Sequence, residues 1–489
     1  MNSRRIRPAQ NCINRPRATS SLKPRIPRRM RSSVVAAAAN ARDYKAALAK
    51  LNLLASNRAI TALFETPSPS SRDLNAQAIP EMRTWLRRAG YSPDDLATMR
   101  HIHVAGTKGK GSVCAFATAL LRAATDRRRP VGTYTSPHLV SPRERIAIDG
   151  EPISQAVFAA AFWQLWERFT AAARAEGRPR DEAEGPASKP FYFRFLTILA
   201  WHVFLQAGVR DVIMECGIGG EYDATNVLPP QAVSAAVVSQ LGVDHVAMLG
   251  GTVGEIAWHK AGIFKPGATA FALGLRGDGA AAAAQHLGVR DATASTAETL
   301  ARLPEETLRA LRGATLRGRC EVVVDEEEGA HNLQWMLDGA HTRESIEQVA
   351  LWLAESLADD DYGAPGVTLV FNQQERDAPA LLTCLADAVA EATNGRRDVF
   401  SRALFTRNEQ AAEDHDGDMS MQRALAETMR TLAPGCSVSV FDNVQSAVAE
   451  ARRTAPAPAG RGRKQKVLVT GSLHLVGGIM RVIEPDSLL

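Results

Sequence analysis

Short apolar runs alternate with longer stretches of helical periodicity along the chain from His101 onward. This alternation is typical of an α/β fold with a parallel sheet. In the first half it predicts strands at His101–Ala105, Val131–Thr135, Asp211–Glu215, Ala232–Gln240 and Thr269–Leu273. Helices are predicted at Ser112–Ala124, Phe193–Gln206 and Val253–Phe264. The polar, Pro- and Gly-rich stretch Ala171–Pro190 interrupts the series and is predicted to be a surface insertion.

A second series of apolar runs begins near residue 320. Its members are CEVVV, LQWML, VTLVFN, DVFSRALF, CSVSVFD and KVLVTGS, and helical stretches separate most of them. We therefore predict a P-loop-type parallel-sheet ATPase domain over residues 43–316 and a smaller Rossmann-like α/β domain over 317–489. The segment 302–318 would join them, 280–288 is expected to be a low-complexity helix, and 454–466 a basic loop.

The charge of the chain is unevenly distributed. Residues 1–42 carry ten Arg and one Lys without any acid, a charge of +11 against +5 for the whole chain, so the remainder carries −6. A mildly acidic body gives no argument for nucleic-acid binding. The longest apolar stretch, Leu196–Val209, includes His202 and Gln206 and is shorter than the ~18 residues of a membrane span, so we predict no integral membrane protein.

The basic segment 1–42 is rich in Arg and Ser, as mitochondrial presequences are. It predicts import into the mitochondrial matrix. Met30 is a candidate internal start that would give a cytoplasmic form. The alternative is a disordered basic tail, which the four prolines between residues 8 and 27 favour because they disrupt a helix.

The loop GTKGKGS, residues 106–112, follows the first predicted strand and precedes a predicted helix. Glycines in such a turn let backbone N–H groups converge on phosphate oxygens at the positive end of the helix. Lys110 is then placed to reach the β- and γ-phosphates and Ser112 to contact Mg²⁺. The loop departs from the usual P-loop pattern at Val104 and Gly111, and glycine-rich turns without a nucleotide are common.

Three ionisable residues follow strand-like runs in the same half. Glu215 ends one predicted strand, His245 follows another, and Lys260 lies on the next predicted helix. Ligands bind at the carboxyl edge of open parallel sheets, and a carboxylate there suits Mg²⁺. Taken singly, each has an ordinary alternative: a salt-bridged acid, a satisfied histidine and a solvated lysine. Their shared placement favours a metal and nucleotide site.

Several longer motifs, in order over residues 43–485, carry a resemblance to a known family. They are GTKGKGS, YTSPHLVSPRERIAIDGEPIS, FYFRFLTILAWHVF, ECGIGGEYDATN, GVDHVAMLGGTVGEIAWHKAGIFKPG, GRCEVV, LDGAHTRES and VTGSLHLVGG. Together they resemble the folylpolyglutamate synthases, a branch of the ATP-dependent amide ligases that include the Mur ligases. DGAHT and FRFLT are similar to the eukaryotic enzymes, whereas Lys108 stands where Asn is frequent.

The resemblance implies a set of site residues. The ATP-binding positions would be Gly106, Thr107, Lys108, Gly109, Lys110, Gly111, Ser112, Arg319 and Asp338. The Mg²⁺ positions would be Ser112, Ser136, Glu215 and His245. Catalytic roles would fall to Lys110, to Lys260 (which the family can carry in carbamylated form) and to His341. The folate-side loop would contribute Pro137, His138, Arg143 and Arg145, although either arginine has the alternative of a structural ion pair.

The resemblance also implies the reaction. An ATP-dependent ligase would add L-glutamate to the γ-carboxylate of tetrahydrofolate (poly)glutamates through an acyl phosphate, giving ADP and phosphate. ATP and Mg²⁺ are the expected cofactors, with a monovalent cation such as K⁺ as an optional further ion. The expected partners are small molecules, with no nucleic acid, and the expected state is a monomer. The alternatives are dihydrofolate synthase, which joins glutamate to dihydropteroate, and a nucleotide-binding protein without ligase activity.

Overall fold

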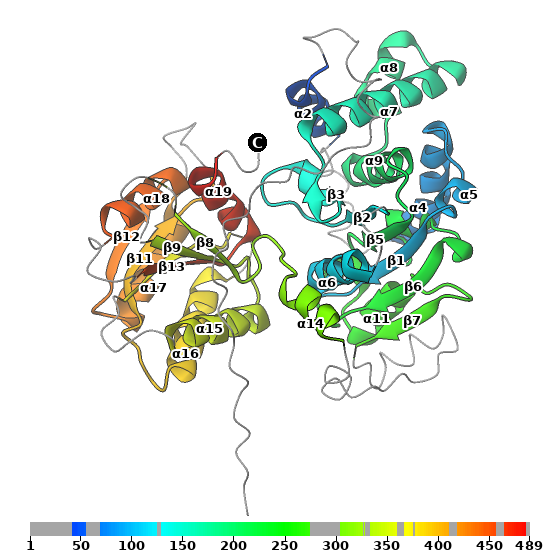
Figure 1. The fold of residues 1–489 in the computed structure, drawn as a ribbon. Coiled ribbons are helices and arrows are strands. Elements are labelled where there is room, and N and C mark those ends of the chain that lie inside the picture. The colour runs from blue at the N-terminus through cyan, green and yellow to red at the C-terminus, as the bar shows by residue number, and fades with distance from the viewer. Residues whose placement is uncertain are drawn as a thin grey trace, which may run out of the picture.

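The computed structural model describes residues 42–54, 69–124, 129–273, 304–325, 327, 333–358, 366–374, 377–409, 418–455 and 464–485. These residues form two lobes, each built around its own sheet, with helix α14 (Glu305–Arg312) between them (Figure 1). The predicted α/β class is confirmed. The predicted basic tail and the low-complexity segment 280–288 lie outside the described residues.

The first sheet has seven strands in the order β4-β3-β2-β5-β1-β6-β7. All its pairings are parallel except those of β3, which is antiparallel to both β2 and β4. The strands are β1 (Arg100–Ala105), β2 (Val131–Tyr134), β3 (Ile146–Ile148), β4 (Glu151–Pro152), β5 (Asp211–Glu215), β6 (Val233–Val238) and β7 (Thr269–Ala272). Because parallel strands end at the same edge, the segments that follow β1, β2, β5 and β6 emerge side by side.

Helices cover both faces of this sheet, and the alternation of side chains along β5 shows how. Val212 and Met214 belong to the large core beneath α7 (Gln155–Ala175) and α9 (Tyr192–Gln206), whereas Ile213 packs in a small cluster with α6 (Lys110–Ala124). The remaining α-helices of this lobe are α2 (Tyr44–Asn52), α4 (Pro69–Arg88), α5 (Pro93–Leu96), α8 (Arg180–Glu184), α10 (Val246–Leu249) and α11 (Val253–Ala261).

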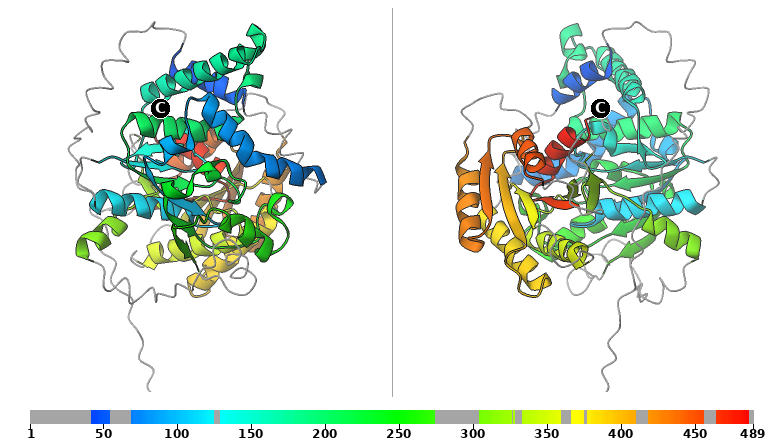
Figure 2. Two further views of the ribbon diagram at one scale, coloured as in Figure 1. Left: turned by 90° about the vertical axis from the view of Figure 1, so that its right-hand side faces the viewer. Right: turned by 60° about the vertical axis from the view of Figure 1, so that its left-hand side comes forward.

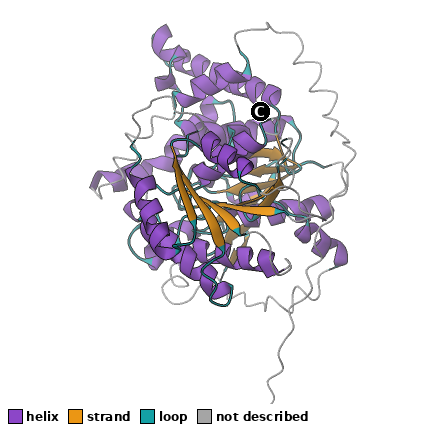
Figure 3. Ribbon diagram, turned by 90° about the vertical axis from the view of Figure 1, so that its left-hand side faces the viewer, coloured by secondary structure: helices purple, strands orange, loops and turns teal. Residues whose placement is uncertain are grey.

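The second sheet has six strands in the order β12-β11-β10-β13-β9-β8, of which β8 alone is antiparallel to its neighbour. They are β8 (Glu321–Val324), β9 (Leu333–Leu337), β10 (Val367–Phe371), β11 (Phe400–Thr406), β12 (Ser437–Phe441) and β13 (Gln465–Thr470). Helices pack on both faces of this sheet as well (Figures 2 and 3). One face carries α15 (Arg343–Ala358), α16 (Ala378–Ala392) and α17 (Ser420–Leu432), and the other α18 (Val444–Arg453) and α19 (Leu473–Ile483).

The described elements agree closely with the apolar pattern of the sequence. Every predicted strand of both series is present, and those of the first half begin and end within about two residues of the expected bounds. The pattern did not identify α4, α7 or the β3–β4 hairpin. The predicted insertion Ala171–Pro190 begins inside α7 and also contains α8, so much of it is helical. The 316/317 domain boundary stays a prediction. Among the described residues, no helix combines the length and apolar character needed to cross a bilayer.

Candidate active site between the two sheets

A cavity of about 1220 Å³ lies between the two lobes. Both sheets supply its walls, and most of the predicted site residues lie on them. Those on the walls are Thr107, Lys108, Gly109, Lys110, Gly111, Ser112, Ser136, Pro137, Arg145, Glu215, His245, Arg319, Asp338 and His341. Four predicted residues do not line it: Gly106, His138, Arg143 and Lys260. The cavity therefore unites residues that are separated by more than two hundred positions in the sequence.

The glycine loop connects β1 to α6 with a tight backbone path. Gly106 has φ of 151°, and a Cβ at this position would lie 1.9 Å from Oγ of Ser239, so a larger residue does not fit. Gly109 has φ of 81°, in the left-handed region. The Lys110 Nζ donates to the carbonyl of Gly106 at 3.0 Å and thus folds back over the loop. The N-terminus of the 15-residue helix α6 meets the cavity here, which is the geometry that binds phosphate.

Glu215 lies at the carboxyl end of β5, beside the glycine loop that follows the neighbouring strand β1, and is 3% exposed. Its Oε2 accepts a hydrogen bond from the backbone N–H of Ser136 at 3.1 Å. Burial raises the pKa of Glu215 to about 7, although the nearby Lys110 ammonium acts in the opposite direction. A bound cation would reverse the effect of burial and hold this carboxylate in its charged form.

The predicted metal donors fit Mg²⁺ in kind. Glu215 supplies a buried carboxylate, Ser112 and Ser136 supply hydroxyls on the same cavity, and His245 lines it from the loop after β6. Within the described residues, no cluster of three or more His, Cys, Asp or Glu side chains has metal-binding geometry. One carboxylate with hydroxyls leaves several positions for phosphate oxygens and water, which is how Mg²⁺ commonly accompanies nucleotides.

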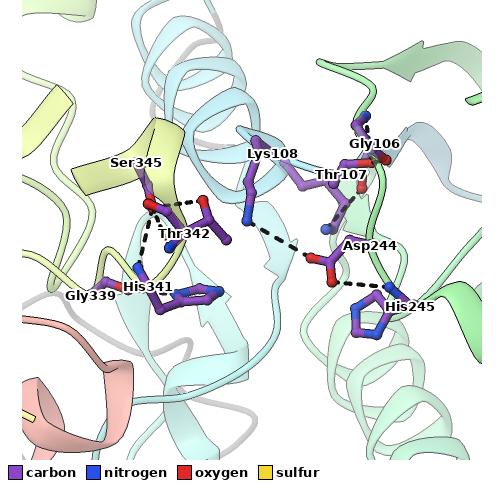
Figure 4. Close-up of polar contacts among 11 residues, drawn as sticks. Gly106, Thr107, Lys108, Asp244, His245, Gly339, His341, Thr342 and Ser345 are labelled. Carbon is purple, nitrogen blue, oxygen red and sulfur yellow. Dashed lines mark hydrogen bonds and ion pairs between the residues drawn. The ribbon is translucent and has the colours of Figure 1, made fainter. Parts of the chain in front are cut away.

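The loop that carries His245 also contacts the glycine loop. His245 adopts a left-handed backbone with φ of 51° at the start of α10. Its N–H donates to Oδ1 of Asp244 at 3.0 Å, and Oδ2 of Asp244 lies 3.8 Å from Nζ of Lys108 (Figure 4). Burial lowers the pKa of His245, which favours the neutral imidazole that metals bind. Asp244 was not among the predicted site residues, although it directly precedes one of them.

Lys260 lies on α11 and is 3% exposed, behind the cavity wall rather than on it. Burial, and then the charge of Lys110, lower its pKa to about 8. A larger fraction of this amine is therefore neutral at physiological pH than in a solvated lysine. Only a neutral amine can react with carbon dioxide, so the environment is compatible with carbamylation, which stays a prediction.

The second lobe presents Arg319, Asp338 and His341 to the same cavity. Asp338, directly after β9, accepts from the N–H of Cys320 at 2.8 Å through Oδ2 and from that of Ala340 at 2.9 Å through Oδ1. Burial raises the pKa of Asp338. The Nδ1 of His341 donates to the carbonyl of Gly339 at 2.8 Å, which fixes the direction of its ring. Figure 4 shows His341 on the opposite side of Lys108 from Asp244.

The Cys320 thiol lies beside Asp338, with Sγ 3.6 Å from Oδ2. Desolvation and the carboxylate together raise the pKa of Cys320 to about 12, so the thiol is protonated although it lines the cavity.

The predicted folate-side residues divide into two groups. Arg145 lines the cavity and donates through Nε to Nδ1 of His138 at 2.9 Å. Its Cζ lies 5.6 Å from the ring centroid of Tyr192. Burial, with the charge of Arg145, lowers the pKa of His138 to about 3, so this imidazole is neutral and accepts the bond. Arg143 instead donates to the carbonyl of Ile153 at 2.8 Å, outside the cavity. This contact is a hydrogen bond to a backbone carbonyl and not the ion pair of the alternative, and the folate-side role of Arg143 stays a prediction.

Sequence reasoning did not assign several wall residues. The start of α9 contributes Phe191, Tyr192, Phe193 and Arg194. The loop after β5 contributes Tyr222, and α11 contributes His259. The FYFRF motif contained the signal, since aromatic residues at the start of a helix beside a ligand edge are placed to contact a flat substrate. Phe193, Arg194 and His259 fall on predicted helices, and none of the six wall residues has a predicted site role.

A glycine-loop nucleotide domain that shares one cavity with a second α/β domain defines the class of this protein: a two-domain, ATP-dependent ligase. No protein-family model matches the chain. A Neurospora crassa folylpolyglutamate synthase is 36% identical over 92% of this chain and 93% of its own length. The Candida albicans folylpolyglutamate synthase is 32% identical over 91% of this chain and 97% of its own length. The chain belongs to the folylpolyglutamate synthase family.

Solved structures share the fold. The chain resembles the Mycobacterium tuberculosis folylpolyglutamate synthase in complex with ADP, with a TM-score of 0.58 and 22% identity, over 89% of this chain and 99% of that one. It also resembles the bifunctional folylpolyglutamate synthase/dihydrofolate synthase of Yersinia pestis in complex with AMPPNP and a Mn ion. That match has a TM-score of 0.57 and 25% identity, over 82% of this chain and 92% of that one.

Proposed function

We propose that the chain adds L-glutamate to the γ-carboxylate of tetrahydrofolate (poly)glutamates, with ATP converted to ADP and phosphate. The observation that carries this proposal is the shared cavity. It brings the glycine loop and Glu215 of one lobe to Asp338 and His341 of the other, with Arg145 on the same wall. The family membership of the chain supports the same reaction.

The first step activates the substrate. A carboxylate does not form an amide with an amine in water because its oxygen is a poor leaving group. The folate γ-carboxylate therefore attacks the γ-phosphorus of ATP while the bond between that phosphorus and the bridging oxygen breaks. The products of this step are an acyl phosphate and ADP. Both reactants are anions, so Lys110 and the N–H groups at the start of α6 stabilise the charge that builds up between them.

Mg²⁺ would be held by Glu215, with Ser112, Ser136 and His245 as further donors. When bound, it neutralises phosphate charge and holds the phosphate oxygens in line for transfer. We also propose a monovalent cation such as K⁺ as an optional further ion. Removal of the metal with a chelator should abolish ADP formation, and added Mg²⁺ should restore it.

The second step joins the amino acid. The amine of glutamate attacks the acyl carbon, and the tetrahedral intermediate expels phosphate. We assign His341 to the region where the amine arrives, because it lines the cavity from the lobe opposite the glycine loop. Acyl phosphates hydrolyse, so the two lobes must exclude water before this step. Arg319 and Asp338 would contact ATP from the second lobe and so make closure depend on bound nucleotide.

An assay of the purified full-length chain tests this proposal. The protein is incubated with ATP, Mg²⁺, L-glutamate and either tetrahydrofolate or dihydropteroate, and the products are identified by mass. We expect tetrahydrofolate to gain glutamyl residues with one ADP released per residue. Extension of dihydropteroate alone would instead indicate a dihydrofolate synthase. ATP binding with no ligation of either substrate would indicate a nucleotide-binding protein.

We further propose that the protein is a monomer located in the mitochondrial matrix, with a cytoplasmic form started at Met30. The composition of residues 1–42 supports the targeting proposal. Fusions of a fluorescent protein to the C-terminus of the full chain and of the chain begun at Met30 would separate the two locations. Equal distribution of both fusions would contradict the proposal that residues 1–42 target the protein to mitochondria. Sedimentation equilibrium of the purified protein tests the monomer.

A further inference from the structure

The segment between β2 and β3, residues 136–145, is here called the substrate loop. It contributes Ser136, Pro137, Leu139 and Arg145 to the cavity wall. It also contains Leu139 and Val140, which pack against the apolar core of the second lobe. One short loop therefore lines the cavity and, at Leu139 and Val140, also touches the opposite lobe.

The middle of the substrate loop is held in a fixed shape by Glu144. Its carboxylate accepts hydrogen bonds from the backbone N–H groups of Leu139, Val140 and Ser141, the first two at 2.8 Å each. Three N–H donors on one carboxylate are charge-assisted bonds and make this part of the loop stiff. The hydroxyls of Ser141 and Tyr44 lie 2.6 Å apart, which ties the loop to α2 as well.

Leu139 fits a socket on the second lobe that depends on two glycines. A Cβ at Gly477 of α19 would lie 2.2 Å from the backbone oxygen of Leu139, and a Cβ at Gly318 would lie 2.8 Å from its Cδ1. Val476 lies beside them in the same core. At both positions the absence of a side chain is what allows the loop to approach.

The ends of the substrate loop are held by separate contacts. The N–H of Ser136 bonds Glu215 at 3.1 Å, and Arg145 bonds His138, which belongs to the same loop, at 2.9 Å. Because the loop is stiff in the middle, a displacement of Leu139 is passed to both ends. A shift of about 1 Å at a reacting centre costs on the order of 100-fold in rate.

We infer that Leu139 is a positioning residue for the ligation: its seat in the Gly318, Val476 and Gly477 socket holds Ser136 and Arg145 in place for the folate. The inference rests on the proposed function of the cavity. It predicts that the second lobe, besides contributing its own side chains, sets the geometry of substrate-binding residues in the first lobe. The alternative is that this contact only packs the lobes together.

Two neighbouring glycines of α19 provide a matched test. In Gly477→Ala the new methyl group meets the carbonyl of Leu139, whereas in Gly478→Ala it meets the carbonyl of Asn408, at 2.8 Å, within the second lobe. Both substitutions place a methyl group against a backbone oxygen on the same helix, and only one of them faces the substrate loop. Leu139→Ala is the milder companion, since it empties the socket without a clash.

The measurements are the KM for tetrahydrofolate, kcat and the Kd for ADP, with amide hydrogen exchange of residues 136–145 in the full chain. For Gly477→Ala we expect the folate KM to rise about 10-fold or more and kcat to fall, with the ADP Kd within about threefold. Leu139→Ala should show a smaller rise in KM. Gly478→Ala should keep both kinetic constants within about twofold of the wild type.

A folate KM that is unchanged in Gly477→Ala, or equally raised in Gly478→Ala, would overturn the inference. If Gly477→Ala does not fold, hydrogen exchange at Ser136 in Leu139→Ala decides instead of the folate KM, because the Leu139 side chain itself lines the cavity. Hydrogen exchange separates this inference from the proposed function, because it needs no turnover. Faster exchange at Ser136 and Leu139 in Gly477→Ala, but not in Gly478→Ala, supports the coupling between the socket and the substrate loop. This result would hold even if the wild type ligates no folate. Unchanged exchange rejects the coupling.

Discussion

The carboxyl edges of the two sheets differ in the polar groups that they bury. The first sheet buries ionisable side chains there, among them Glu215 at 3% exposure and Lys260 on the adjacent α11. Apart from Asp338, the second buries mainly amides and hydroxyls, such as Asn372 and Thr470, which are both 0% exposed. Buried charge is costly and is kept where a charged reaction takes place, whereas a neutral network fixes shape without responding to pH.

The strongest way to break this contrast is to remove charge from the first edge. Lys110→Ala should lower turnover by about 10³-fold, because the variant loses the ammonium that offsets phosphate charge in the transition state. Stopped-time assays of ADP formation in the presence of folate and glutamate measure the loss. Lys108→Ala is the matched control, since Lys108 is paired with Asp244, and a loss of about 10-fold is expected. Equal losses would contradict the assignment of Lys110.

Acidification should weaken the first lobe selectively. Burial lowers the pKa of His101 and of His202 to about 4 each, and that of His103 well below its usual value. These imidazoles stay neutral in the fold but take up protons when unfolded, below about pH 6.5. Their contribution to stability is therefore complete above pH 6.5 and is lost as pH falls toward 4, by about 2 kcal/mol per buried histidine at pH 5. The Glu215 carboxyl, whose pKa burial raises to about 7, takes up its proton in the fold first and offsets part of this loss. The two described histidines of the second lobe do not lie in its core, because His474 is exposed and His341 lines the cavity.

Hydrogen exchange at pH 7.5 and pH 5, followed separately for peptides of the two lobes, measures this difference. We expect the free energy of opening to fall in the first lobe and to change little in the second. In His101→Gln the fall in the free energy of opening between pH 7.5 and pH 5 should be smaller by the contribution of one histidine, about 2 kcal/mol. An equal loss in both lobes would contradict the contrast.

The smallest expected effect lies in the neutral network of the second lobe. Asn372 donates to Asn408 and accepts from Gln422, each at 2.9 Å. Asn372→Ala leaves the buried amide of Gln422 without its acceptor and should lower the free energy of unfolding by about 1–3 kcal/mol. Urea titration measures it, and the loss should be the same at pH 6 and pH 8. Asn408→Ala, at a more exposed position, is the control and should cost less.

The apolar pattern was sufficient to predict most of the strands because buried parallel strands are short continuous apolar runs bounded by turns. It failed at α7, where a helix that starts in an apolar stretch continues into the polar segment after Ala171. It also failed at the β3–β4 hairpin, because strands of three and two residues carry too few positions to show alternation.

The candidate site could be predicted where chemistry and position coincide. The residues of the glycine loop and Glu215 directly follow or end strands, and the sheet edge brings them together. The sequence could not show that Arg145 lines the cavity and Arg143 does not. They are two residues apart in a 3₁₀ turn, and only the contact of Arg143 with Ile153 shows that it turns from the cavity.

The protonated thiol of Cys320 bears on how this enzyme meets reactive molecules. Peroxides and electrophilic drugs attack the thiolate, and desolvation together with the Asp338 carboxylate keeps that form scarce at the cavity wall. The Cys320 thiol should therefore react slowly with peroxides and with covalent inhibitors. Asp338, proposed to contact ATP, thus has a second effect on the chemistry of the cavity wall.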